Sequence, residues 1–368
     1  MERYSNVECR VSTQNKYLTL NRLREAAHRI ARIESRMPIN VVGLGEVLWD
    51  LLPTGHQLGG APTNFAYHVH ALGTQVRAQA KVITRVGDDD YGREILRRFV
   101  EMGLDTTTIQ VDKTAPTGTA KVEISTDGQT HFTIQENVAW DFLAPIDEAL
   151  AAARRADAIC FGTLAQRSAP SRATIQQLVA ASPANMLRVL DINLRQPFYL
   201  RGVIEESLQL ANVLKLNDEE LSILAEMFNL AASPKSCGAD APVRVSAAEQ
   251  SSVPTGACAA DQIKRQIKCL AKTFGLRLVA LTRGANGSLL YQESEKRWSD
   301  YPSRPIKVVD TVGAGDSFTA ALVLGLLRKK DLDEINEIAN EVARYVCSQP
   351  GATPPMPLEF AKRFAGSQ

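Results

Sequence analysis

An aspartate stands where a glycine-rich turn runs into an apolar helix, in the stretch 308–325 that reads VVDTVGAGDSFTAALVLG. Small residues at Gly313, Ala314 and Gly315 let backbone N–H groups approach a ligand closely, and the first turn of a helix leaves its N–H groups without partners. Such a helix start attracts anions. Asp316 could simply cap the helix, or it could accept the proton of a hydroxyl that attacks a phosphoryl group held by the turn.

Three common nucleotide or hydrolase signatures are missing from the sequence. No G-x-x-x-x-G-K-[ST] phosphate loop occurs, and Gly43 and Gly45 are followed by Leu48 where a dinucleotide fingerprint needs a third glycine. No G-x-S-x-G nucleophile elbow occurs either. Any phosphate chemistry must therefore use a different anion site, and the turn before Asp316 is the candidate.

The composition is that of an ordinary globular protein. Of 368 residues, 45% are hydrophobic and 23% are charged, and the formal net charge is +1. No basic excess is present to neutralise a nucleic-acid backbone, so we expect no nucleic-acid partner. The six cysteines are scattered without a C-x-x-C pair, which indicates reduced thiols. No run of 18 apolar residues occurs, so we expect no membrane span.

The first 37 residues differ from the rest of the chain. They open with charges of both signs where a secretory signal would have an apolar segment. Apolar residues from Leu20 to Ile30 recur at helical spacing, which predicts an amphipathic helix added to the core. Acidic residues such as Glu25 argue against an organellar transit peptide. We therefore expect a cytoplasmic protein, with organellar targeting by this extension as the alternative.

Short apolar runs alternate with helical patterns from Ile39 towards the C-terminus. The runs lie at 39–53, 82–87, 158–164, 187–194, 212–217, 276–284 and 287–292, and the helical stretches between them include 91–102, 172–181 and 218–228. This alternation predicts an α/β fold with a mostly parallel central sheet and helices on both faces. Ligands of such sheets bind beyond the carboxyl ends of the strands.

Two segments break the alternation. Residues 117–135 alternate in polarity around Asp127 and Gly128, which predicts a β-hairpin. That hairpin is either an edge decoration or a lid that closes over a substrate and excludes water. Residues 231–262 are rich in Ala, Ser, Pro and Gly without a helical or strand period, and we interpret them as a surface insertion.

The turn around Asp316 resembles a family signature. DTVGAGDSF is similar to the C-terminal motif of the ribokinase-like (PfkB) carbohydrate kinases, and the resemblance covers nearly all of 39–357. Further motifs follow in family order: GEVLWDLLP, LGGAPTNFAYHVHALG, DINLRQPFY, KLNDEEL, LTRGANGSLL and SQPGATPPMP. Among these, GGAP-x-N preceded by GE is typical of fructokinases. The resemblance implies a ribokinase-like kinase domain over 38–368, with 117–135 as a small β lid, and leaves 1–37 as an extension.

The resemblance also implies roles on the sugar side of the site. Asp316 would be the catalytic base, and Gly313, Ala314 and Gly315 would form the anion hole. The sugar hydroxyls would be bound by Asp50, Gly59, Gly60 and Asn64. Short polar groups on tight turns suit this role, because each unpaired buried hydroxyl costs about 1–3 kcal/mol. Without the resemblance, Asp50 would be interpreted as a loop cap and Asn64 as a residue of a helix start.

Two more residues of the sugar side have alternative interpretations. Trp140, shortly after the hairpin, either closes on the sugar or packs in the core. Arg195 ends the D-x-N-x-R stretch that begins at Asp191. It either reaches substrate or phosphate, or it forms a plain salt bridge.

The nucleotide side of the resemblance implies ATP and Mg²⁺. Asn217 and Glu220 match an N-x-x-E motif that places Mg²⁺ through water, although a polar residue followed three later by Glu is also a capping box. Asn193 belongs to the same side, and the nucleotide would be bordered by Thr282, Arg283, Gly284 and Gly287. Members of the family often bind K⁺, which here would lie between Asp310, Val312 and Gly351.

The resulting hypothesis is an ATP-dependent sugar kinase that converts D-fructose to fructose 6-phosphate. The first alternative is a kinase of the same fold that acts on ribose, 2-keto-3-deoxygluconate or a nucleoside. Phosphorylated sugars are less favoured because 50–73 contains no lysine or arginine, although Arg167 and Arg195 keep them open. The alternatives of other classes are a non-catalytic sugar-binding regulator and a scaffold built on 231–262. The expected partners are the sugar, ATP and a second copy in a homodimer formed through the lid.

Overall fold

The computed structural model describes residues 38–53, 55–124, 130–230 and 256–365. By its contacts the chain divides into two units, and the fold below belongs to the unit Ile39–Gln368. The helix expected within 16–37 lies outside the described residues.

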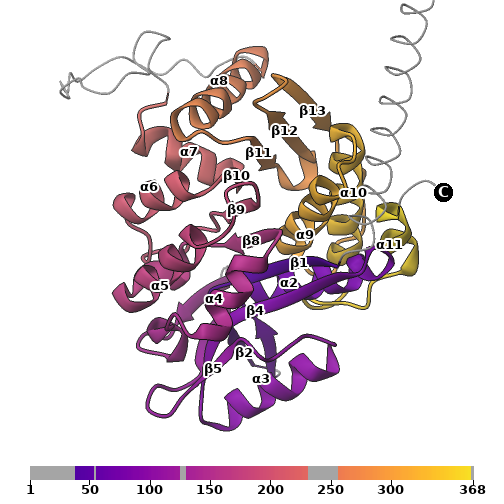
Figure 1. The fold of residues 1–368 in the computed structure, drawn as a ribbon. Helices are drawn as coiled ribbons and strands as arrows, with labels where there is room; N and C mark the ends of the chain where they lie inside the picture. The colour runs from indigo at the N-terminus through magenta and orange to yellow at the C-terminus, as the bar shows by residue number, and fades with distance from the viewer. Residues whose placement is uncertain (1–37, 54, 125–129, 231–255, 366–368) are drawn as a thin grey trace, which may run out of the picture. The chain divides into compact units, whose positions relative to one another are not determined.

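A nine-stranded sheet forms the centre of this unit (Figure 1), in the order β13-β12-β11-β10-β9-β8-β1-β4-β5. The strands are β1 Ile39–Leu44, β4 Ala78–Gly87, β5 Ile109–Asp112, β8 Ala158–Phe161, β9 Leu187–Asp191, β10 Val213–Asn217, β11 Leu278–Thr282, β12 Ser288–Gln292 and β13 Arg297–Tyr301. Every neighbouring pair from β11 to β5 is parallel, whereas β12 pairs antiparallel with both β11 and β13. The mostly parallel sheet is therefore confirmed, while β5 and β13 were not predicted.

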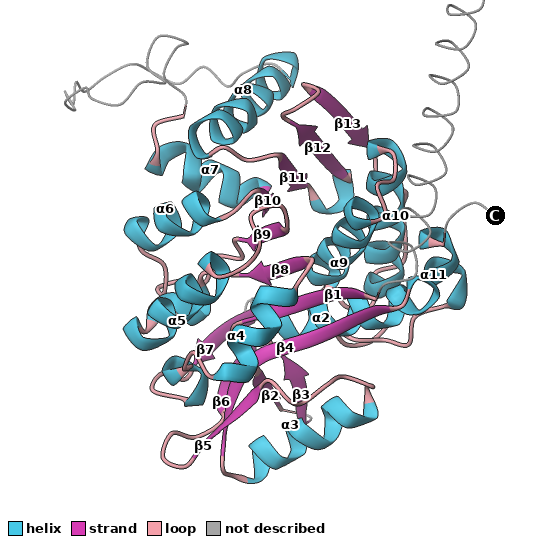
Figure 2. Cartoon of the chain, viewed as in Figure 1, coloured by secondary structure: helices cyan, strands magenta, loops and turns pink. Residues whose placement is uncertain are grey.

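Helices cover both faces of the sheet (Figure 2). The α-helices are α2 Ala61–Leu72, α3 Asp90–Glu101, α4 Asp147–Arg155, α5 Ala169–Ala180, α6 Arg201–Leu210, α7 Asp218–Met227, α8 Gly256–Phe274, α9 Ala314–Leu327, α10 Leu332–Cys347 and α11 Leu358–Phe364. The three predicted helices at 91–102, 172–181 and 218–228 are confirmed within three residues as α3, α5 and α7.

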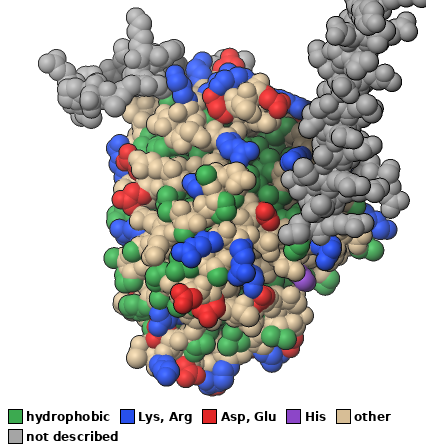
Figure 3. All heavy atoms as spheres, viewed as in Figure 1, with side chains coloured by type: hydrophobic (Ala, Val, Ile, Leu, Met, Phe, Trp, Pro, Cys, Tyr) green, Lys and Arg blue, Asp and Glu red, His purple; other side chains and the backbone are tan. Residues whose placement is uncertain are grey.

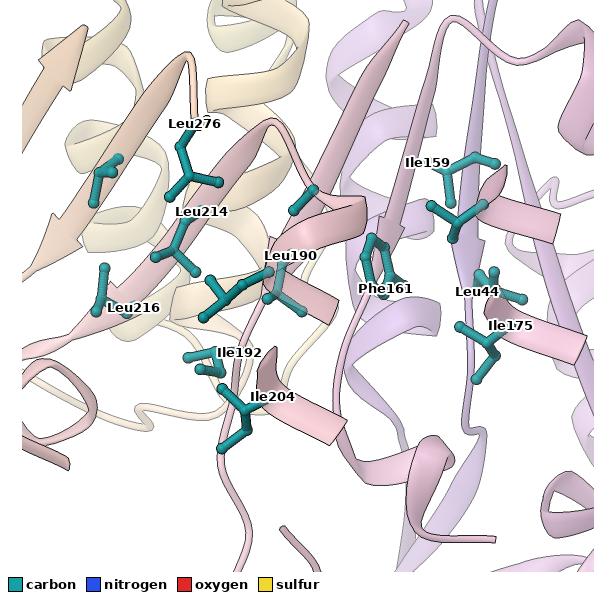
Figure 4. Packing of buried hydrophobic residues seen from close by; sticks show 14 of the residues in the cluster. Leu44, Ile159, Phe161, Ile175, Leu190, Ile192, Ile204, Leu214, Leu216 and Leu276 are labelled. Carbon is teal, nitrogen blue, oxygen red and sulfur yellow. The ribbon is translucent and has the colours of Figure 1, made fainter. Parts of the chain in front are cut away.

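The central strands bury both of their faces, because neighbouring residues of a strand point to opposite sides. Val42 belongs to the core cluster beneath α4 to α8, whereas Val41 belongs to the cluster beneath α2, α9 and α10. Figure 4 shows the first cluster, where Phe161, Leu190 and Leu214 from adjacent strands lie side by side. This double burial explains the near-continuous apolar runs in the sequence.

A second, four-stranded sheet has the order β3-β2-β6-β7. Strands β6 Gly118–Ile124 and β7 Thr130–Ile134 pair antiparallel, which confirms the predicted hairpin, although its turn at Asp127 lies outside the described residues. The hairpin pairs through β6 with β2 Leu48–Leu52, and β2 pairs with β3 Gly55–Gly59. The single strand predicted over 39–53 is wrong, since this segment divides into β1 and β2 of two different sheets.

The predicted insertion 231–262 requires a correction at its C-terminal end. Helix α8 begins at Gly256, so residues 256–262 form its first turns. The alanines in GACAADQ favour a helix, and the apolar side continues through Ile267 and Leu270 into the core. The remainder of the segment, 231–255, lies outside the described residues.

Basic and acidic side chains are interspersed on the face drawn in Figure 3. No helix in the described part of the chain is long and apolar enough to cross a membrane.

Leu190→Ala tests the packing of the sheet. Leu190 is fully buried in β9, so we expect the substitution to destabilise the protein by about 2–5 kcal/mol. Leu200→Ala is the matched control, since Leu200 is 62% exposed and should cost less than about 0.5 kcal/mol. The free energy of unfolding from urea titrations compares the two, and equal losses would contradict the packing described.

Candidate active site

A small cavity lies where the chain order of the sheet reverses. Strand β1 pairs with β4 on one side and β8 on the other, and the loops that follow diverge at such a point. The cavity measures about 10 Å³, space for roughly one water molecule. Its lining includes Glu46, Ala61, Cys160, Asp191, Asn193 and Asp316. Two predicted site residues, Asn193 and Asp316, therefore come together here.

The turn before α9 packs closely against Ala352 and leaves backbone N–H groups without partners. Gly313 has φ 78°, and a side chain there would come within 2.4 Å of the Ala352 carbonyl oxygen. Ala314 N–H bonds weakly to the Thr311 carbonyl at 3.3 Å. In the described part of the chain, the N–H groups of Gly315 and Asp316 have no backbone acceptor. These two donors, at the positive end of α9, fit an anion.

Asp316 is half-buried in the first turn of α9, and Asn64 Nδ2 donates to its Oδ2 at 2.9 Å. Burial and the nearby Asp191 carboxylate together raise the pKa of Asp316 to about 6. The hydrogen bond from Asn64 and the charges of Lys215 and Arg195 oppose this rise. The result is a carboxylate that ionises near neutral pH, as a general base requires.

Lys215 and Asp191 form a buried ion pair beneath the turn. Lys215 Nζ lies 3.0 Å from Asp191 Oδ1, and Thr319 Oγ1 donates to Asp191 Oδ2 at 2.9 Å. A side chain at Gly315 would meet Lys215 Nζ at 2.8 Å, so the ammonium group lies directly against the turn. Asp191 raises the pKa of Lys215 against the effect of burial, which keeps the lysine charged. The turn therefore has a fixed positive charge behind it.

Four predicted sugar-binding residues lie on three consecutive elements, β2, β3 and the start of α2. Asp50 is in β2, and a side chain at Gly59 in β3 would come within 2.4 Å of Asp50 Oδ2. Gly60, at φ 108°, caps α2 and packs against the Glu46 carbonyl, and Asn64 follows one turn later. Burial raises the pKa of Asp50 to about 6. The glycines are thus needed for close approach, and of the two polar side chains Asn64 reaches Asp316 directly.

Arg195 and Trp140 occupy different surroundings. Arg195 is exposed and forms no ion pair among the described residues, and its charge lowers the pKa values of Asp50 and Asp316. Trp140 is buried in the core, with the Arg167 guanidinium 4.0 Å above its ring. Arg167 in turn pairs with Asp141 at 2.8 Å. The arrangement favours packing for Trp140, and its contact with a sugar stays a prediction.

Asn217 and Glu220 form a reciprocal capping box at the start of α7. Asn217 Oδ1 accepts from Glu220 N–H at 2.8 Å, and Glu220 Oε2 accepts from Asn217 N–H at 2.8 Å. Glu220 Oε1 accepts from the Leu194 N–H at 2.9 Å. Both carboxylate oxygens are already engaged, so this pair fits a Mg²⁺ ion that keeps its waters better than one bound directly. Within the described residues, no three His, Cys, Asp or Glu side chains gather as a metal site.

The predicted nucleotide border follows β11. Thr282 Oγ1 donates to the Leu216 carbonyl at 3.3 Å, and Arg283 Nη2 forms an ion pair with Asp300 at 2.5 Å. Gly284 and Gly287 have φ 52° and 83°, and a side chain at Gly287 would collide with the Tyr301 carbonyl. Arg283 therefore connects β11 to β13, which gives it a structural role.

Asp310 connects the two segments expected to surround K⁺. Its Oδ1 accepts from Val312 N–H at 3.0 Å, and its Oδ2 accepts from Gly351 N–H at 3.1 Å. The segments are thus held together by one carboxylate, while K⁺ binding itself stays a prediction.

The sequence matches a known family over most of its length. The model of the pfkB family carbohydrate kinases covers residues 53–359. This chain belongs to the pfkB family of carbohydrate kinases. It is 28% identical to a fructokinase of Klebsiella pneumoniae over 312 residues, which cover 82% of this chain and 88% of that protein. It is also 27% identical to a fructokinase of Solanum tuberosum over 340 residues, 87% of this chain and 93% of the relative.

Solved structures of other members share the fold. A sugar kinase of Pyrococcus horikoshii in complex with ATP superposes with a TM-score of 0.68 at 24% identity, covering 88% of this chain and 99% of that one. A fructokinase of Xylella fastidiosa with bound ATP gives 0.68 at 22% identity, with coverages of 89% and 97%. The fold of this pfkB kinase is therefore ribokinase-like, as expected.

Two residues near Asp316 were not singled out from the sequence. Lys215 could have been found as the one charge in the buried strand pattern VLKLN. Glu46 could have been found as an acid between the buried segments INVVGL and LWDLL. Both signals are buried charges, which need a partner or a ligand.

Asp316→Asn tests the electrostatics of the site without any substrate. The folded-state pKa of Asp316, about 6, lies above the usual 3.8, so stability from this group is full below pH 3.8 and is lost as pH rises through about 6. An asparagine escapes this loss. We expect Asp316→Asn to raise the melting temperature at pH 8 and to have little effect at pH 4.

Asp88→Asn is the control for this measurement, because Asp88 is 59% exposed in its pair with Arg93. Thermal unfolding monitored by circular dichroism from pH 4 to 8 gives both differences. A pH-independent effect of Asp316→Asn would show that the carboxylate is not destabilised by burial.

Proposed function

We propose that this kinase transfers the γ-phosphoryl group of ATP to the primary hydroxyl of D-fructose, producing fructose 6-phosphate. The observation that carries the proposal is the position of the Asp316 carboxylate. Asn64 of α2 donates a hydrogen bond to this carboxylate. The carboxylate belongs to the first turn of α9, where the N–H groups of Gly315 and Asp316 have no backbone acceptor among the described residues. A proton acceptor and an anion site thus adjoin within one turn.

In the proposed reaction, Asp316 accepts the proton of the attacking hydroxyl. The N–H groups of the turn and the charge of Lys215 stabilise the negative charge on the phosphoryl oxygens. Asn64 orients the Asp316 carboxylate and has its buried Oδ1 without a partner among the described residues. That oxygen is free to accept a hydrogen bond from a sugar hydroxyl. Asp50, Gly59 and Gly60 would complete the sugar side.

The nucleotide side is proposed from the positions of the remaining residues and from the ATP complexes of the two solved relatives. Asn193, Thr282, Arg283, Gly284 and Gly287 would border ATP. Asn217 and Glu220 would hold Mg²⁺ through water, and the ion would neutralise charge between the phosphates. Asp310, Val312 and Gly351 would frame K⁺.

Fructose is proposed as the acceptor because of the fructokinase form of the sugar-side motif and the fructokinases among the relatives. Identities of 26–28% leave ribose and 2-keto-3-deoxygluconate as the alternatives to be tested. A non-catalytic regulator is less well supported, since the base and the anion turn are both intact. A homodimer through the small sheet remains part of the proposal.

A coupled ATP-turnover assay across a sugar panel tests both the activity and the acceptor. We expect fructose to give the highest kcat/KM, and Asp316→Ala or Asp316→Asn to lower kcat at least about 10²-fold, as expected for losing a general base. Asp88→Asn should keep wild-type turnover. Near-wild-type kcat in both Asp316 variants would remove the mechanism, whereas preference for another sugar would change only the acceptor.

Arg195→Gln tests whether the arginine acts on the base. The Arg195 charge lowers the pKa of Asp316, so its removal should raise that pKa. The carboxylate is then ionised only at higher pH. The midpoint pH of the fall of kcat/KM on acidification, near 6 in the wild type, should therefore be higher in the variant. Arg201→Gln serves as the control, because the Arg201 guanidinium lies over Phe228 at 5.3 Å, outside the site. An unchanged acid limb in Arg195→Gln would show that Arg195 does not influence the base.

A further inference from the structure

Glu46 is a buried acid in the cavity beside Asp316. It lies in the loop between β1 and β2 and is 5% exposed. Its side chain lines the same cavity as Asp191, Asn193 and Asp316. Its Oε2 has no hydrogen-bond partner among the described residues. A buried carboxyl oxygen without a partner is costly, and the cavity of about 10 Å³ has space for one hydroxyl group that could supply the partner.

The surroundings of Glu46 favour the protonated acid near neutral pH. Burial raises the pKa of Glu46 to about 7, and the Asp316 carboxylate of α9 contributes to the rise. The Arg195 charge and the N–H groups of Glu46 and Ala61 oppose it. The other ionisable groups lining this cavity are Asp191 of β9 and Cys160 of β8, whose pKa is also raised by burial.

Glu46 and Asp316 are neighbouring acids of one cavity. The pKa of Asp316 is raised to about 6 and that of Glu46 to about 7, and the charge of an ionised Asp316 opposes the ionisation of Glu46. One proton shared between the two acids leaves one carboxylate to accept a hydrogen bond and one carboxyl group to donate one. Neighbouring acids with separated pKa values commonly divide such roles.

We propose that Glu46 is a sugar-binding residue whose protonated carboxyl group donates a hydrogen bond through Oε2 to a hydroxyl of the acceptor. The donor would hold the sugar against the Asp316 carboxylate while the phosphoryl group occupies the turn. This inference rests on the proposed function. The competing structural explanation is that Glu46 only accepts from the Ala61 N–H and so fixes the start of α2.

Two substitutions separate these explanations. Glu46→Gln keeps the shape, keeps an acceptor for the Ala61 N–H and donates at every pH. We expect wild-type kcat/KM to rise through pH 6, as Asp316 ionises, and to fall above pH 7, as Glu46 loses its proton. Glu46→Gln should lose the fall above pH 7 and keep the rise through pH 6. Glu46→Leu removes the donor, so the KM for the sugar should rise about tenfold at pH 6.5. Its KM for ATP should stay within about twofold.

The control is Glu341→Gln, whose carboxylate pairs with Arg363 at 2.8 Å in the C-terminal part of the chain. It should keep the complete wild-type pH profile. Circular dichroism establishes that each variant is folded before its kinetics are compared. An alkaline fall that persists unchanged in Glu46→Gln, or a wild-type sugar KM in Glu46→Leu, would overturn the proposal.

Failure of the proposed function gives a different result. Wild-type protein would then turn over ATP with no sugar of the panel, and no sugar would raise its melting temperature. If wild type is active but the Glu46 variants retain its pH profile and sugar KM, only the role of Glu46 is wrong.

Discussion

The buried ion pair between Asp191 and Lys215 joins the three elements on which the candidate site depends. The two residues are register partners, Asp191 as the last residue of β9 and Lys215 as the middle residue of β10. Thr319 of α9 donates to Asp191, and Lys215 Nζ lies against Gly315. Because both side chains are more than nine-tenths buried, removing either would leave an uncompensated charge, at a cost of about 3–5 kcal/mol. The pair therefore fixes the start of α9 over the ends of the strands.

The same region concentrates negative charge. Burial raises the pKa values of Glu46, Asp50 and Asp316, each to between about 6 and 7. Lys215 and Arg195 are the cations that reduce the rise in Asp316. If its surroundings stabilised the ionised form fully, the pKa of the carboxyl group would be low and the carboxylate would be a weak base. Without nearby cations, its pKa would be so high that the group would stay protonated. In the proposed mechanism, the basicity of Asp316 is thus obtained at the expense of stability, as is common in active sites.

The sequence was sufficient for those parts of the fold that depend on local patterns. The apolar runs predicted the parallel strands, because a strand buried on both faces has apolar residues at consecutive positions. The spacing of Asn217 and Glu220 predicted the start of α7. The sequence failed where the decisive partner lies far along the chain. Strand β13, with the sequence RWSDY, has no continuous apolar run, and it joins the sheet by antiparallel pairing with β12. The pairing of Arg283 with Asp300, a residue of that strand, could likewise not be predicted from the sequence around Arg283.

In the candidate site, too, local motifs were predictable from the sequence and contacts with distant residues were not. The turn at Gly313 and the acid Asp316 were visible as a motif, but Lys215 is explained by its ion pair with Asp191, which lies 24 residues away. Likewise, Asp50 followed from a resemblance, whereas its membership of the small sheet depends on the distant β6. A charged residue inside an apolar segment of the sequence indicates that the residue is buried and needs a partner. It does not show which residue that partner is.

The pairing of β2 with β6 has a mechanical consequence for the proposed lid. Asp50 is the register partner of Ala120, so the strand that would bind the sugar is hydrogen-bonded to the hairpin that would cover it. At its other edge β2 pairs with β3, which leads through Gly60 directly into α2 and Asn64. A hairpin attached in this way cannot shift without moving Asp50 or breaking strand pairing. Sugar binding at Asp50 would therefore favour one position of the hairpin, and closure would be coupled to the presence of the acceptor.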